Sequence, residues 1–153
     1  GRPLESGAGR RQPAGDFRAE LQPGQVRTLD QVRGILESGS AQVVDARPAG
    51  RFRGVDPEPR AGLRGGHMPG ARNLPYADLV DATGRMLPPD ILRARLQAAG
   101  IDPDRPVVAT CGSGTSSCAV LLALEVLGAP AGALYDGSWT EWGGRDDVPV
   151  ASE

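Results

Sequence analysis

VVATCGSGTSSCAVLLALEVLGA, residues 107–129, is the stretch that decides the fold of this chain. The apolar run at residues 107–110 is typical of a short buried strand, and the segment after Ser117 has the length and the Ala and Leu content of a helix. Cys111 therefore falls at a strand-to-helix turn, where the backbone N–H groups of the loop can point at one spot.

The turn after Cys111 suits a nucleophilic thiol. Converging N–H groups and the positive end of a helix stabilise an anion, so they lower the pKa of a nearby cysteine. Gly112 and Gly114 let the chain turn tightly, and hydroxyl donors follow at Ser113, Thr115, Ser116 and Ser117. The sequence predicts a reactive thiolate at Cys111, and a buried structural cysteine beside a glycine-rich turn is the alternative.

Helix and strand patterns alternate along the rest of the chain. Thr28 and Gln31 form a capping-box pattern that begins a helix running to about Ser38. A second helix is expected from Pro89 to Ala99, because proline suits a first turn and a glycine follows the last one. Further strands are predicted in the stretches AQVVDA (41–46), ARNLP (71–75) and GALYDG (132–137), with a short helical turn in SWTEWGG (138–144) and a long loop at 47–69.

This alternation predicts an α/β fold with a central parallel sheet and helices on both faces. In such folds, ligands bind beyond the carboxyl ends of the strands, which is where Cys111 falls. We therefore expect the functional site at that end of the sheet.

Composition and charge exclude several classes of protein. At 153 residues with 39% hydrophobic content, the chain suits one globular domain. A formal net charge of −2 gives no reason to expect nucleic acid or a membrane as a partner, and the lack of a long apolar run or signal pattern favours a cytoplasmic protein. Two cysteines and one histidine make neither a disulfide framework nor a zinc site, so we expect free thiols, no metal and no organic cofactor.

Three motifs stand in a characteristic order: VVDARPAGRFRGVDPEPRAGLRGGHMPGARNLP (43–75), CGSGTSSC (111–118) and LYDGSWTEWG (134–143). Together they resemble the rhodanese-type sulfurtransferases, specifically the carboxy-terminal catalytic domain of the two-domain enzymes. The resemblance implies a rhodanese-like three-layer α/β fold for residues 25–153. It also implies that residues 1–24, which are rich in Gly, Pro and Arg, are the tail of an amino-terminal rhodanese domain and an interdomain linker.

The resemblance implies covalent sulfur transfer. Cys111 would take a sulfane sulfur from a small-molecule donor as a persulfide and pass it to a thiol, such as that of a thioredoxin-like protein, or to cyanide. The neutral Gly112 and Ser113 after the cysteine resemble the enzymes that use 3-mercaptopyruvate rather than thiosulfate. Arg51 and Arg60 match the ligands of the donor carboxylate and carbonyl, and Ser113 matches a hydroxyl that helps to move protons. The remaining loop residues would form the anion cradle: Gly112, Gly114, Thr115, Ser116 and Ser117.

The chain departs from the family pattern in two ways. The family commonly has VTAC where this chain has TSSC at residues 115–118, so the loop is richer in hydroxyls. A further acidic residue of the proton relay belongs to the amino-terminal domain, which is therefore expected as a partner. Thiosulfate sulfurtransferase activity and a non-catalytic rhodanese-like interaction module are the alternatives. A cysteine phosphatase is disfavoured, because its C-x5-R pattern needs arginine where Ser117 stands.

Several chemically suggestive side chains are expected to be structural. We expect His67 in a turn and Cys118 as a packed thiol in the first turn of the helix. Structural or solvated roles are likewise expected for Asp45, Asp136, Arg53, Arg64, Trp139 and Trp142.

Overall fold

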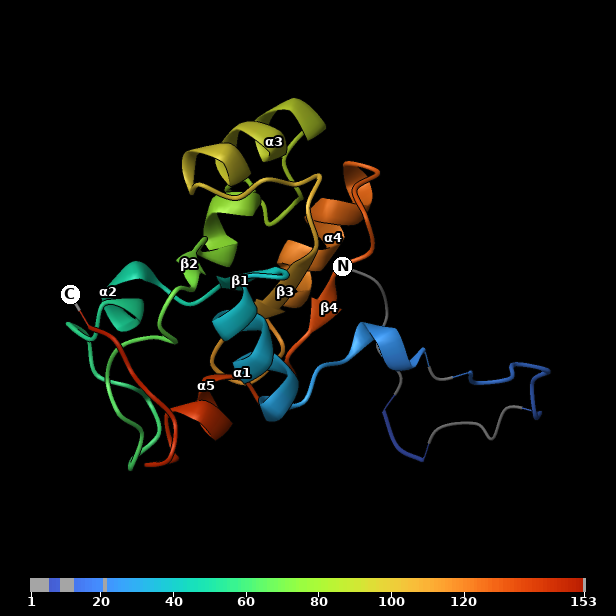
Figure 1. Cartoon of the computed structure of the whole chain (residues 1–153). Coiled ribbons are helices and arrows are strands. Elements are labelled where there is room, and N and C mark those ends of the chain that lie inside the picture. Colours follow the sequence, from blue (N-terminus) through green and yellow to red (C-terminus); the bar gives the residue numbers. More distant parts are fainter. Residues whose placement is uncertain (1–5, 9–12, 21, 153) are drawn as a thin grey trace.

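The computed structural model describes residues 6–8, 13–20 and 22–152. Its centre is a sheet of four parallel strands in the order β2-β1-β3-β4, which confirms the predicted sheet (Figure 1). The strands are β1 (Gln42–Asp45), β2 (Arg72–Asn73), β3 (Val107–Thr110) and β4 (Ala133–Leu134). The two central strands are buried along their whole length, including the polar residues Gln42, Asp45 and Thr110 at their ends.

Helices cover both faces of this sheet, which confirms the three-layer architecture (Figure 1). Successive strand residues point to opposite faces, so Val44 and Ala109 join one core while Val43 and Val108 join the other. The first core lies against α3 (Pro89–Ala98), α4 (Cys118–Val126) and the 3-10 helix η2 (Tyr76–Leu79), and the second lies against α1 (Leu29–Ser38) and α5 (Ser138–Trp142).

The predicted helix ends are confirmed. In α1, the Thr28 hydroxyl accepts from the Gln31 N–H and the Gln31 side chain accepts from the Thr28 N–H, which is the capping box that the sequence indicates. The helix ends at Gly39, whose φ of 65° lies in the left-handed region. Pro89 opens α3 in the same place as predicted.

Two expectations need correction. Residues 47–69 were expected to be loop, but they contain the one-turn helix α2 (Ala49–Phe52), which is too short to leave a periodic pattern. The capping-box pattern also leads us to expect that regular structure begins near Thr28, but the 3-10 helix η1 spans Pro23–Gln25, and Val26 forms a parallel bridge with Leu134. In Figure 1, the described residues of 13–20 extend away from the body.

The side chains expected to be structural mostly are. Trp139 and Trp142 are buried in the core under α5. His67 stacks on Phe52, and its Nδ1 lies 2.9 Å from the Phe52 carbonyl oxygen. Arg64 donates to backbone carbonyls of Trp142, Gly143 and Val148. No helix in the described residues is long and apolar enough to cross a membrane.

Candidate active site

Cys111 is the first residue after β3, at the carboxyl end of the sheet. Its thiol is free and its side chain is 1% exposed. Its backbone N–H donates to the Ser138 hydroxyl at 3.2 Å, and its carbonyl accepts from the Trp139 N–H at 2.9 Å. The amino end of α5 therefore fixes the start of the loop that follows Cys111.

The environment of Cys111 favours the thiolate. Burial raises the pKa of this thiol, but hydrogen bonds from the Ser116 hydroxyl and from the backbone N–H groups of Ser113 and Ser117 outweigh it. The net effect is a Cys111 pKa below its ordinary value. The sequence predicts this direction, and the Ser116 hydroxyl does the most to lower the pKa of Cys111.

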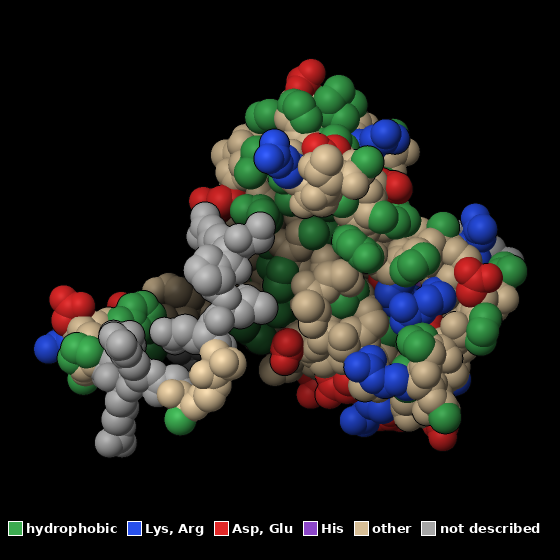
Figure 2. Space-filling view, turned by 180° about the vertical axis from the view of Figure 1, so that it is seen from behind, with side chains coloured by type: hydrophobic (Ala, Val, Ile, Leu, Met, Phe, Trp, Pro, Cys, Tyr) green, Lys and Arg blue, Asp and Glu red, His purple; other side chains and the backbone are tan. Residues whose placement is uncertain are grey.

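A cavity of about 550 Å³ opens beside Cys111. Most predicted site residues line it: Arg51, Arg60, Cys111, Gly112, Ser113, Thr115 and Ser116, together with Arg47, Pro48, Pro59 and Tyr76. In Figure 2, arginine side chains gather on the side of the molecule that carries α2. Among the described residues, no group of three or more His, Cys, Asp or Glu side chains is placed to hold a metal ion.

Two predicted cradle residues lie outside this lining and support the loop instead. Gly114 has a φ of 83°, and a Cβ atom there would stand 2.7 Å from an Asp136 carboxylate oxygen. The buried Ser117 hydroxyl donates to the Gly114 carbonyl at 2.8 Å. These contacts set the curve of the loop that aims its N–H groups at the thiol.

Arg51 is held by a buried ion-pair network. The Glu58 carboxylate, which is 2% exposed, accepts hydrogen bonds from both Arg51 and Arg47. Arg47 also pairs with Asp45 and lies over the Trp139 ring, with its guanidinium carbon 4.2 Å from the ring centre. The network thus fixes the direction in which Arg51 faces the cavity.

Arg60 is held differently. Its Nη1 donates to the Thr140 hydroxyl at 3.0 Å, and that hydroxyl donates to the Gly112 carbonyl at 2.6 Å. A single neutral hydroxyl therefore links the second arginine of the cavity to the loop that follows Cys111.

Apart from the Cys111 thiolate itself, the charged side chains at the cavity leave one net positive charge. Arg47, Arg51 and Arg60 line the cavity, whereas Asp45 and Glu58 pair with the first two. Arg60 instead donates to a neutral hydroxyl, so it carries the uncompensated charge. Such a cavity suits a ligand with one negative charge.

The sequence reasoning missed the supporting residues Glu58, Arg47, Thr140 and Ser138. Glu58 had a visible signal, because it stands between the candidate arginines Arg51 and Arg60 in the first of the three motifs. Ser138 had no such signal. Its φ of 52° is the single positive value among described non-glycine residues, and this backbone conformation places the Ser138 hydroxyl where it accepts from the Cys111 N–H. These contacts join segments far apart in the chain.

The expectation that Cys118 is packed is wrong. Its side chain is exposed, and its Sγ lies 3.5 Å from the Gly114 carbonyl oxygen. The helical repeat explains this, because Val120, Ala123 and Leu124 form the buried face of α4 and Cys118 falls on the other side.

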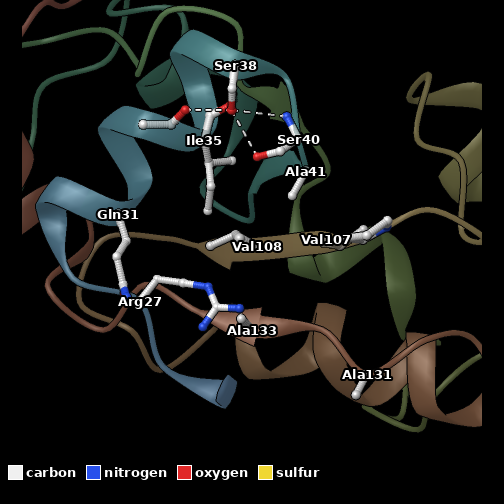
Figure 3. Close-up of a pocket in the computed structure, with 12 residues that line it drawn as sticks. Arg27, Gln31, Ile35, Ser38, Ser40, Ala41, Val107, Val108, Ala131 and Ala133 are labelled. Atoms are coloured by element: carbon white, nitrogen blue, oxygen red, sulfur yellow. Dashed lines mark hydrogen bonds between the residues drawn. The ribbon is translucent and has the colours of Figure 1, made fainter. Parts of the chain in front are cut away.

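A second groove of about 420 Å³ lies at the opposite end of β3 (Figure 3). It runs between α1 and the amino-terminal residues Val107 and Val108 of the strand. Its Ser38 hydroxyl is already bonded to the Gly34 carbonyl and to Ser40. No cysteine is among the described residues that line the groove, and the groove is remote from Cys111 along the strand, so it adds nothing to the chemistry of the site.

Comparisons with known proteins agree with this fold. Residues 28–145 match the model of the rhodanese-like domain, and the chain belongs to that family. It is 44% identical over 140 residues to human 3-mercaptopyruvate sulfurtransferase, covering 92% of this chain and 47% of the relative. It is 40% identical over 136 residues to the mitochondrial thiosulfate/3-mercaptopyruvate sulfurtransferase 1 of Arabidopsis thaliana, covering 89% of this chain and 36% of the relative.

A solved structure of the rhodanese fold also matches this chain. The crystal structure of SseA from Escherichia coli, described as a 3-mercaptopyruvate sulfotransferase with the rhodanese fold, superposes with a TM-score of 0.70 at 39% identity. The match covers 84% of this chain and 47% of that one. The chain thus spans about half the length, or less, of these relatives.

Proposed function

We propose that this chain is the catalytic half of a sulfurtransferase that moves a sulfane sulfur from 3-mercaptopyruvate, through a Cys111 persulfide, to an acceptor. The observation that carries the proposal is a thiol with a lowered pKa at the wall of a cavity that Arg51 and Arg60 also line. The curated names of the relatives support the same activity and the same donor.

The first half of the reaction follows from these groups. The Cys111 thiolate attacks the sulfur of the donor, an S–S bond forms, and the C–S bond breaks with its electron pair left on carbon. The resulting pyruvate enolate takes one proton to become pyruvate, and the persulfide gives one up. The exposed Ser113 hydroxyl lines the cavity and is proposed to pass this proton.

The second half returns the enzyme to its starting state. An acceptor thiolate or cyanide attacks the outer sulfur of the persulfide, the S–S bond breaks, and the Cys111 thiolate leaves. The hydrogen bonds that lower the Cys111 pKa also stabilise this leaving group. Hydroxyl and N–H donors from Gly112 to Ser117 form the proposed anion cradle, with Thr115 and Ser116 at the cavity wall.

Charge favours 3-mercaptopyruvate over thiosulfate as the donor. 3-Mercaptopyruvate carries one carboxylate, which matches the single uncompensated charge at Arg60, whereas thiosulfate is a dianion. Arg51 would bind the donor carbonyl or share the carboxylate, while the Glu58 carboxylate balances the charge of Arg51. No basic side chain stands at residues 112 and 113 to compensate a second negative charge.

Two further parts of the proposal concern the surroundings of the domain. We propose that residues 1–24 are an interdomain linker and that a second rhodanese-like domain completes the wall of the cavity, since the relatives are matched over about half their length. The two free thiols support a reducing compartment such as the cytoplasm, with a thioredoxin-like protein or a small thiol as acceptor.

Thiocyanate formation tests the donor. With cyanide as acceptor, kcat/KM should be higher for 3-mercaptopyruvate than for thiosulfate. Arg60→Met should lower kcat/KM for 3-mercaptopyruvate with little change in the thermal unfolding temperature. The opposite donor order would favour a thiosulfate sulfurtransferase. No product from either donor, in the domain and in a chain extended by an amino-terminal rhodanese domain, would favour a non-catalytic module.

A further inference from the structure

Thr140 lies at the junction of two parts of the site. Its side-chain oxygen accepts from Arg60 Nη1 at 3.0 Å and donates to the Gly112 carbonyl at 2.6 Å. Because a hydroxyl has one proton to donate, these two contacts fix its orientation. Two hydrogen bonds thus connect Arg60, through the Thr140 hydroxyl, to the loop that begins at Cys111.

The Gly112 carbonyl does not depend on this hydroxyl. It also accepts from the Thr140 backbone N–H at 3.0 Å, and the Trp139 N–H holds the Cys111 carbonyl in the same way. Removing the hydroxyl would therefore leave the loop anchored to α5. The group that would lose its protein partner is the Arg60 guanidinium, which is exposed and has a long side chain with many rotamers.

The arginines of the cavity thus differ in how they are positioned. Arg51 is fixed by the buried carboxylate of Glu58, whereas Arg60 relies on one exposed hydroxyl. A neutral partner positions Arg60 without reducing its charge, so the cation stays available for a donor carboxylate. The same hydroxyl sets the distance between that cation and the loop that bears the nucleophile.

Resting on the proposed function, we propose that Thr140 is a positioning residue for donor binding. It holds Arg60 at a fixed place relative to Gly112 and hence relative to the Cys111 thiol. It acts through Arg60 and touches neither the reacting sulfur nor the proton that moves. Its loss should weaken the binding of a carboxylate donor and leave the chemical step largely intact.

The test measures the rate of sulfur loading of Cys111 in a single turnover at increasing 3-mercaptopyruvate concentrations. Thr140→Val keeps the shape of the side chain and removes the hydroxyl, whereas Thr140→Ser keeps the hydroxyl. We expect Thr140→Val to raise the half-saturating concentration about fivefold, the typical net effect of losing one hydrogen bond, with a maximal rate within about twofold of the wild type. Thr140→Ser should restore the wild-type value.

Arg60→Met and the double variant Arg60→Met/Thr140→Val complete a cycle. If Thr140 acts through Arg60, the second substitution has no further effect once Arg60 is gone. Provided that the wild type loads sulfur, any of three results would overturn the inference. The half-saturating concentration of Thr140→Val could equal that of the wild type, that of Thr140→Ser could stay raised, or the effects of the two substitutions could multiply in the double variant. A wild type that does not load sulfur at all, alone or joined to an amino-terminal domain, would overturn the proposed function and this inference with it.

Discussion

The Arg51 guanidinium lies 3.1 Å from the place that a Cβ atom would occupy on Gly112. The loop thus carries no side chain where it passes the arginine, and the arginine cannot retreat freely because Glu58 holds it. The glycine after Cys111 is needed for a close approach of side chain to backbone as well as for the turn.

Gly112→Ala should therefore weaken donor binding. The backbone of Gly112 is not in the left-handed region, so alanine adds a contact with Arg51 and little strain. We expect a half-saturating 3-mercaptopyruvate concentration about fivefold higher, with the free energy of unfolding changed by less than about 1 kcal/mol. Gly34→Ala, in an open position of α1, is the matched control. Equal donor binding in both variants would refute the contact.

Glu58→Gln tests the ion-pair network. The substitution leaves Arg47 paired with Asp45 alone and breaks the ion pair of Arg51. The Glu58 side chain is only 2% exposed, so the charge is lost from buried surroundings. Breaking a buried pair in this way should lower the free energy of unfolding by about 3 kcal/mol, as urea denaturation measures it. Glu37→Gln, on the exposed side of α1, should change it by less than about 0.5 kcal/mol. A loss as small as that of the control would show that Glu58 stabilises nothing.

Ser116→Ala should raise the pKa of Cys111. The Ser116 hydroxyl bonds the thiolate, so its removal disfavours the charged form while burial continues to raise the pKa. The pH profile of Cys111 alkylation by iodoacetamide should shift to higher pH, with slower alkylation near neutral pH because less thiolate is present. Ser40→Ala, at the other end of the sheet, should leave the profile unchanged. An unshifted profile in Ser116→Ala would contradict the assigned bond.

Cys118→Ser should leave sulfur transfer within about twofold of the wild type. Cys118 is exposed on α4, and its weak contact with the Gly114 carbonyl can be made equally well by a hydroxyl. Steady-state thiocyanate formation checks this. Loss of turnover in a folded Cys118→Ser variant would give Cys118 a part in the reaction.

Local signals predicted the fold well. The capping box at Thr28, the proline at the start of α3 and the apolar runs of β1 and β3 each act over a few residues, so the sequence displays them directly. The one-turn helix α2 escaped because four residues cannot show a helical period.

That Cys111, Arg51 and Arg60 lie at one cavity was predictable from the sequence, whereas the contacts that hold the two arginines were not. The cavity gathers Cys111, Arg51 and Arg60, whose motifs are visible in the sequence. The bond between Arg60 and Thr140 joins residues 80 positions apart, and no local pattern reports such a pair. The exposure of Cys118 likewise depended on which face of α4 meets the sheet.

The most direct test of the account is intact-mass spectrometry after incubation with 3-mercaptopyruvate, of this chain alone and joined to an amino-terminal rhodanese domain. We expect the mass of one added sulfur atom, absent in Cys111→Ser and removed again by a thiol acceptor. No added sulfur on either form of the protein, or equal loading of Cys111→Ser, would contradict the central claim that Cys111 carries the transferred sulfur.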